Sequence, residues 1–164
     1  MLTNAAASHA EPEPCGWPID LADAGLRWRG RLWVAGAHAL GGQALDGVVD
    51  QGAWVLDCAG LVKERWEARA GRFAQHVFED LERVPSGFER LLDLCRAWAA
   101  DLLREQPPHL VVTCAHGMNR SALAAGLILR EAGLSPAEAV TRIRAARPGA
   151  LNNRVFESLL LASG

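Results

Sequence analysis

The chain has 164 residues, of which 50% are hydrophobic and 22% charged, and its formal net charge is −2. This composition is that of a single soluble domain with a sizeable core, and the net charge excludes a strongly basic protein drawn to nucleic acid or anionic membranes. No apolar run approaches the ~20 residues that a membrane-spanning helix needs.

The N-terminal segment, MLTNAAASHAEPEP, has neither a basic start nor an apolar stretch. We therefore expect no secretory signal, and a cytoplasmic location. Residues 1–20 are rich in Ala, Pro and Glu and have no period, which predicts a flexible tail in front of one domain over residues 21–164.

The four cysteines show no CxxC spacing, which argues against a zinc site or a disulfide framework. We expect reduced thiols, with Cys58 and Cys95 in the core and Cys15 exposed in the tail. No metal ion and no other cofactor is expected.

The first half of the domain contains candidate strands around one helical segment. Leu26–Gly36 alternates apolar and polar residues, which predicts a short hairpin or two edge strands. Residues 39–50 carry apolar residues at helical spacing. Ala53–Cys58 and Gln75–Phe78 are predicted strands, and the second leads into Glu79 and Asp80.

The second half alternates helices with a strand. Ser86 and Glu89 form a capping box, which predicts a helix that runs to about Arg104. Leu110–Val112 is apolar without alternation, as in a strand buried on both faces. Further helices are expected over Ser121–Ala132, from Ser135-Pro136 to a point before Pro148, and over Arg154–Ala162. This order predicts an α/β fold, a single domain with a central, mostly parallel sheet flanked by helices.

The segment that follows the buried strand reads Cys114-Ala115-His116-Gly117-Met118-Asn119-Arg120-Ser121. A bare Cys-x5-Arg is a weak motif, but this one lies between a strand and a helix, where backbone N–H groups and the helix dipole converge on an anion. Gly117 permits a tight turn. We therefore predict a substrate-binding loop made of Ala115, His116, Gly117, Met118, Asn119 and Arg120.

Each reactive residue of this loop has a chemical role. Cys114, at a helix N-terminus beside an arginine, is expected to be a thiolate at neutral pH and a nucleophile toward phosphorus. The planar guanidinium of Arg120 can bind two phosphate oxygens. The Ser121 hydroxyl can donate a hydrogen bond to the sulfur as it leaves. For His116, orienting its neighbours by a hydrogen bond is favoured over substrate contact.

Cleavage of a phosphate ester also needs a proton for the leaving oxygen. Asp80, in the loop after the 75–78 strand, is the preferred general acid, and Glu79 and Glu82 are its competitors. Asn152 and Asn153 either cap the last helix or lie beside the loop, and the cap is the preferred interpretation.

These features resemble the dual-specificity branch of the protein tyrosine phosphatase family, whose pattern is His-Cys-x5-Arg-Ser/Thr with an upstream aspartate. The resemblance extends from about Leu26 to Leu161 and departs at Thr113, where the family has histidine. It implies Cys114 as nucleophile, Arg120 as phosphate clamp, Ser121 as donor to the sulfur and Asp80 as acid. It further implies a monomeric, metal-independent phosphomonoesterase with a phosphocysteine intermediate, whose substrates are proteins or peptides phosphorylated on Tyr or Ser/Thr.

A narrower resemblance connects Cys114–Arg120 to the loops of RNA 5′-triphosphatases of the same superfamily, through His116 and Asn119. An RNA 5′ end is therefore the alternative substrate, although the net acidity disfavours nucleic acid. A phosphate-binding module without turnover is the second alternative. In each case phosphate, sulfate or vanadate should occupy the loop, and no membrane partner is expected.

Overall fold

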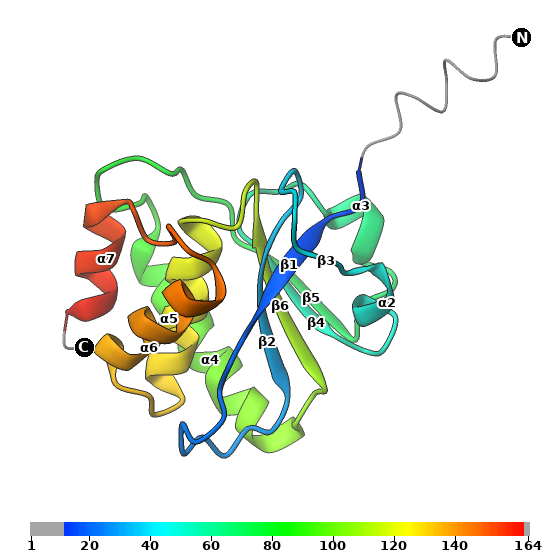
Figure 1. Ribbon diagram of the computed structural model, residues 1–164, viewed down its shortest axis with the longest axis horizontal. Coiled ribbons are helices and arrows are strands. Elements are labelled where there is room, and N and C mark those ends of the chain that lie inside the picture. The colour runs from blue at the N-terminus through cyan, green and yellow to red at the C-terminus, as the bar shows by residue number, and fades with distance from the viewer. Residues whose placement is uncertain (1–11, 163–164) are drawn as a thin grey trace, which may run out of the picture.

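A computed structural model describes residues 12–162. Its strands form one sheet in the order β3-β1-β2-β6-β4-β5 (Figure 1). The parallel part consists of β2, β6, β4 and β5, and β1 pairs antiparallel with both β2 and β3. The predicted mostly parallel sheet is thereby confirmed. The strands are β1 (Cys15–Ile19), β2 (Arg31–Gly36), β3 (Gln43–Ala44), β4 (Trp54–Asp57), β5 (Arg72–Gln75) and β6 (His109–Cys114).

Helices cover both faces of the sheet (Figure 1). One face carries α4 (Phe88–Glu105), α5 (Arg120–Glu131), α6 (Pro136–Ala146) and α7 (Arg154–Leu161), and the other carries α2 (Asp46–Val49) and α3 (Lys63–Trp66). Helix α5 is the central one, buried from Ser121 to Leu129. Within residues 12–162, no helix is both long and apolar enough to cross a membrane.

The central strands bury side chains on both faces, which explains their lack of polar alternation. Val55 and Val111 pack in the layer beneath α2 and α3, together with Trp66. Leu56 and Val112 pack in the larger layer beneath α4–α7. The strands predicted at residues 53–58 and 110–112, and the helices that became α4, α5, α6 and α7, are confirmed.

The expected tail over residues 1–20 is wrong in its last part. Cys15–Ile19 is a strand that pairs with both β2 and β3. Cys15 is buried rather than exposed, and its thiol donates to the carbonyl of Ala39 (3.1 Å). The strand has only five residues, one of them a proline, which is too short for an alternating pattern to emerge. Residues 1–11 of the expected tail lie outside the described residues.

Three local expectations in the first half of the chain need correction. In the segment Leu26–Gly36 only Arg31–Gly36 is a strand, and it is interior because β1 covers its other side. The helical segment at residues 39–50 consists of the short strand β3 followed by the one-turn helix α2. The strand predicted at 75–78 lies three residues earlier, at Arg72–Gln75, and leaves residues 76–87 as a loop.

The two predicted capping boxes have different outcomes. Helix α4 begins after Gly87, which has a left-handed backbone, and no side chain caps its first turn. The Ser86 box is therefore wrong. Ser135 does cap α6, since its hydroxyl accepts from the Glu138 amide (3.2 Å) and Pro136 occupies the first helical position.

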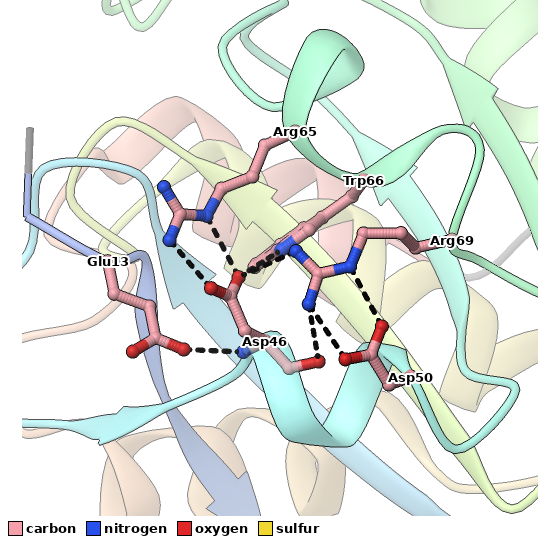
Figure 2. A network of polar contacts seen from close by, with 6 residues as sticks. All are labelled: Glu13, Asp46, Asp50, Arg65, Trp66 and Arg69. Atoms are coloured by element: carbon pink, nitrogen blue, oxygen red, sulfur yellow. Dashed lines mark hydrogen bonds and ion pairs between the residues drawn. The ribbon is translucent and has the colours of Figure 1, made fainter.

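An ion-pair network fastens α2 to α3 and to the segment before β1 (Figure 2). The Asp46 carboxylate accepts from Arg65 (2.8 and 2.6 Å) and from the indole N–H of Trp66 (2.8 Å). The backbone amide of Asp46 donates to Glu13 (2.8 Å), while Arg69 pairs with Asp50. The hydrogen bonds from Arg65 are the largest cause that lowers the pKa of Asp46, to about 2.

Replacement of Asp46 by Ala should lower the free energy of unfolding at pH 7 by about 1–3 kcal/mol, because the Trp66 indole N–H loses its acceptor. The folded-state pKa of Asp46 is below its unfolded value, so this stabilisation is complete above pH ~4 and is lost as the pH falls toward 2. Urea unfolding of both proteins at pH 7, 4 and 2 measures the difference. Asp50→Ala, at an exposed pair, is the control and should change little. A difference between wild type and Asp46→Ala that is equal at all three pH values would contradict the assignment.

Candidate active site

The loop from Cys114 to Arg120 lies at the carboxyl edge of the parallel strands, where it joins β6 to α5. Five of its carbonyl groups accept hydrogen bonds, four from neighbouring segments and one from the first turn of α5. The bonds are Ala37 N–H to Cys114 O (2.9 Å), His38 N–H to Ala115 O (2.8 Å), Arg147 Nη2 to His116 O (3.1 Å), Leu151 N–H to Met118 O (2.8 Å) and Leu123 N–H to Asn119 O (2.8 Å). These bonds fix the orientation of the peptide groups of the loop.

The amide groups of the same loop are in the opposite situation. None of the backbone N–H groups from Ala115 to Arg120 donates a hydrogen bond to another residue in the described range 12–162. They are therefore available to an external acceptor, and they precede the first turn of a twelve-residue helix. Free amides at a helix N-terminus form a site for an oxyanion.

Two glycines allow this loop to lie against the end of β2. Gly117 has a left-handed backbone, with φ of +72°, as the sequence predicts for a tight turn. A Cβ on Gly36 would lie 2.7 Å from the carbonyl carbon of His116 and 2.8 Å from the carbonyl oxygen of Ala115. Real Cβ atoms do not approach backbone so closely, so a side chain at residue 36 would displace the loop. The sequence analysis missed Gly36, whose only signal was a glycine directly after an apolar strand.

The candidate catalytic residues converge around Cys114. Its sulfur lies 3.3 Å from the Ser121 hydroxyl, and both residues are buried. The Arg120 guanidinium donates to the carbonyl of Phe78 (3.3 Å), which connects it to the 76–87 loop. The structure thus brings together the three residues that the motif predicted.

A pocket of about 270 Å³ opens over the loop, and Asp80 is the one carboxylate among the described residues that line it. The lining residues are Asp80, Cys114, His116, Met118, Asn119, Arg120 and Asn152. Glu79 instead pairs with Arg83 (2.7 Å) and lines an adjoining hollow of about 310 Å³, while the exposed Glu82 lines neither. Of the three acids considered, only Asp80 shares a pocket with Cys114. Ala115 and Gly117, which the sequence also predicts to bind substrate, are not among the residues that line it.

Asn153 caps helix α7, as predicted, and it also contacts Asp80. Its side-chain oxygen accepts from the amides of Val155 (3.1 Å) and Phe156 (3.2 Å), which caps α7. Its amide nitrogen also donates to Asp80 (2.9 Å). A pair of asparagines after a turn signals the cap, but the contact with Asp80 depends on the fold and is not visible in the sequence.

Cys58, Cys95 and a larger hollow elsewhere do not contribute to the lining of this pocket. Cys58 and Cys95 are buried, as predicted, and burial raises the pKa of both thiols. A hollow of about 710 Å³ lies at the opposite edge of the sheet, against the start of β2 and β6, and is lined by residues such as Asp20, Arg29 and His109. It contains no cysteine.

Several solved structures of phosphatases have a similar fold. Human DUSP28 has 23% identity and a TM-score of 0.63, with 92% of this chain and 94% of that chain covered. Tk-PTP, in a crystal structure of its active form, has 26% identity over 71% of this chain and 80% of that chain, with a TM-score of 0.56. A mouse putative dual specificity phosphatase, complexed with zinc tungstate, has 23% identity and a TM-score of 0.63, with coverage of 92% and 87%.

These neighbours confirm the resemblance to the dual-specificity branch at the level of the fold, and they support a phosphatase function. No family model matches the sequence. No curated protein matches it either.

Replacement of Gly36 by Ala should weaken the binding of vanadate, a phosphate mimic, by about 10-fold or more, because the displaced loop would lose at least one hydrogen bond to a charged group, worth about 1.5–3 kcal/mol. Isothermal titration calorimetry measures the affinity. Gly47→Ala is the matched control, since a Cβ there meets nothing within 4 Å. Equal vanadate affinity in the two variants would show that the contact between β2 and the loop does not shape the site.

Proposed function

We propose that this protein is a phosphomonoesterase that works through a cysteinyl-phosphate intermediate, and that it is a dual-specificity protein phosphatase. The observation that carries the proposal is the loop itself. Most of its carbonyl groups accept hydrogen bonds from the protein while its backbone N–H groups are free, around a buried cysteine and an arginine. This arrangement suits a phosphate dianion at the position of nucleophilic attack.

In the first step the Cys114 thiolate attacks phosphorus, and the bond from phosphorus to the ester oxygen breaks. The loop amides and the two-pronged Arg120 guanidinium hold the three non-bridging oxygens as their charge redistributes. Asp80, in protonated form, gives its proton to the departing oxygen, so the product leaves as an alcohol or a phenol.

In the second step a water molecule attacks the phosphocysteine, and the Asp80 carboxylate takes a proton from it. The bond from sulfur to phosphorus breaks and inorganic phosphate leaves. The hydroxyl of Ser121, 3.3 Å from the sulfur, donates a hydrogen bond to the thiolate that forms. This contact supports the role in expelling the sulfur that the motif suggested for Ser121.

The surface around the pocket supports a protein substrate. Five of the six large aliphatic side chains that are most exposed in residues 12–162 lie in loops after β2, β4 and β5, and we call them the apolar rim: Leu40, Leu61, Val77, Leu81 and Val84. Parallel strands end at one edge of the sheet, so these loops surround the carboxyl end of β6. Exposed apolar groups gathered at a site indicate a protein-interaction surface.

The RNA alternative has less support from the same surface. The hollow next to Arg120 is lined by Val77, Phe78, Glu79 and Ser86. Another of about 350 Å³ includes Leu61, Glu64 and Arg65, and the Arg65 guanidinium is itself paired with Asp46. Carboxylates and aliphatic groups at these positions suit a peptide better than a polyphosphate chain. A monomeric state and a cytoplasmic location remain predictions.

Replacement of Cys114 by Ser should abolish turnover of phosphopeptides and retain phosphate binding, because a serine hydroxyl is not ionised at neutral pH while the loop amides remain. Arg120→Lys should also lose about 10²-fold or more, since lysine lacks the two-pronged contact. Steady-state kinetics and phosphate titration measure both. Wild-type protein that binds phosphate but turns over no phosphopeptide would favour the binding module, and residual wild-type rate in Cys114→Ser would exclude the nucleophile.

Replacement of Leu61 by Asp should raise the KM for phosphopeptides about threefold to tenfold, as expected when part of an aliphatic contact is lost, and leave a small aryl phosphate unaffected. Leu161→Asp is the control, because Leu161 is equally exposed (43% against 44%) but ends α7. A parallel assay with triphosphate-ended RNA tests the alternative. Faster RNA hydrolysis than peptide hydrolysis, with no effect of Leu61→Asp, would reverse the substrate assignment.

A further inference from the structure

Both oxygens of the Asp80 carboxyl group accept hydrogen bonds from asparagine side chains. Oδ1 accepts from Asn153 Nδ2 (2.9 Å) and Oδ2 accepts from Asn119 Nδ2 (3.1 Å). Asn119 belongs to the Cys114–Arg120 loop, called the phosphate loop below, and Asn153 is the N-terminal cap of α7. Three segments that are distant in the sequence therefore meet at the candidate acid.

The orientation of each asparagine is fixed by bonds on its other side. The Asn119 oxygen accepts from the backbone amide of Asn153 (3.0 Å), so its nitrogen faces Asp80 and Asn152. The Asn153 oxygen caps α7, so its nitrogen faces Asp80 and the carbonyl of Leu81 (2.9 Å). Both asparagines are buried, with 7% and 5% of their surface exposed. A flipped amide would place oxygen against carboxylate and break the cap.

The turn that presents Asn153 is itself held in an unusual conformation. Leu151, a buried leucine, has a left-handed backbone with φ of +60°, which costs a side-chain-bearing residue energy and persists only where its surroundings impose it. The Leu151 amide donates to Met118 in the phosphate loop, and its carbonyl accepts from Arg144 (2.9 Å). The turn is thereby tied to the same loop that Asp80 faces.

We propose that Asn153 and Asn119 are positioning residues that hold the Asp80 carboxyl group at the phosphate pocket before substrate binds. This inference rests on the proposed function. Residues 76–87 form neither helix nor strand, so without these contacts the position of Asp80 would depend on a loop. The two amides tie it instead to a helix N-terminus and to the oxyanion site.

Asn153 offers a substitution that separates positioning from folding. In Asn153→Ser the hydroxyl can still cap α7, so helix stability is retained, but the donor to Asp80 is absent. The variants to compare are wild type, Asn153→Ser, Asp80→Asn and the double variant Asn153→Ser/Asp80→Asn. Ser135→Ala is the matched control, because it loosens the start of a helix by removing the α6 cap and has no contact with Asp80.

Two substrates report on the acid. A phosphotyrosine peptide needs its leaving oxygen protonated, whereas an activated aryl phosphate needs little help. Asp80→Asn should slow the peptide by ~10²–10⁴-fold, the usual worth of a positioned acid. Asn153→Ser should slow it by about 10-fold or more, leave the aryl phosphate within about twofold, and reduce the part of the pH–rate profile that depends on a protonated carboxyl group. It should add no further loss in the Asp80→Asn background.

The outcomes separate the two levels of the proposal. Asn153→Ser that matches wild type on both substrates, slows both equally, or adds its full effect to that of Asp80→Asn would overturn the positioning role. So would Asp80→Asn at wild-type rate on the peptide, or Ser135→Ala with the same selective loss as Asn153→Ser. Wild-type protein that hydrolyses neither substrate would overturn the proposed function, and the inference with it.

Discussion

The amides of the Cys114–Arg120 loop are free for an anion because neighbouring segments occupy its carbonyl groups. The hydrogen-bond donors are the backbone N–H groups of Ala37 and His38 after β2, the Arg147 side chain at the end of α6, and the Leu151 N–H in the turn before α7. Because a trans peptide group is planar, its C=O and N–H point in opposite directions. A group whose oxygen bonds to a neighbouring segment therefore directs its N–H toward the interior of the loop. The anion site is therefore built by the packing of three other segments as much as by the motif, and this explains why a short motif alone has little value as evidence.

The topology then determines what surrounds this site. Strands β2, β6, β4 and β5 are parallel, so the loops that follow them collect at one edge of the sheet. The loop over residues 76–87 places Asp80 in the pocket at that edge. The residues of the apolar rim belong to the loops after β2, β4 and β5, at the same edge. Ligand sites at the carboxyl ends of parallel strands are a general outcome of this architecture. Asp80 and Cys114 are distant in the sequence, and they lie close together because the strands that precede them run in the same direction.

The sequence was informative where one pattern had one physical cause. The unbroken apolar run at residues 110–112 predicted a central strand, and Ser135-Pro136 predicted a helix start, because burial and capping act locally. Prediction failed where a distant partner decides the structure. β1 exists because β2 and β3 pair with it, and Gly36 matters because the phosphate loop lies against it. Likewise, no local pattern could show that Asn153 reaches Asp80.

Asn119 shows how the same limit affects a functional motif. Together with His116 it made the loop similar to those of RNA 5′-triphosphatases, which suggested a role toward an RNA end. In the fold its side chain is fully engaged, with its oxygen bonded to the amide of Asn153 and its nitrogen to Asp80 and Asn152. A side chain whose donors and acceptor are already hydrogen-bonded within the protein has few groups free to bind a substrate. Asn119 is therefore better evidence for how the Asp80 carboxyl group is held than for the identity of a substrate, and under the proposed function the surface around the pocket selects the substrate.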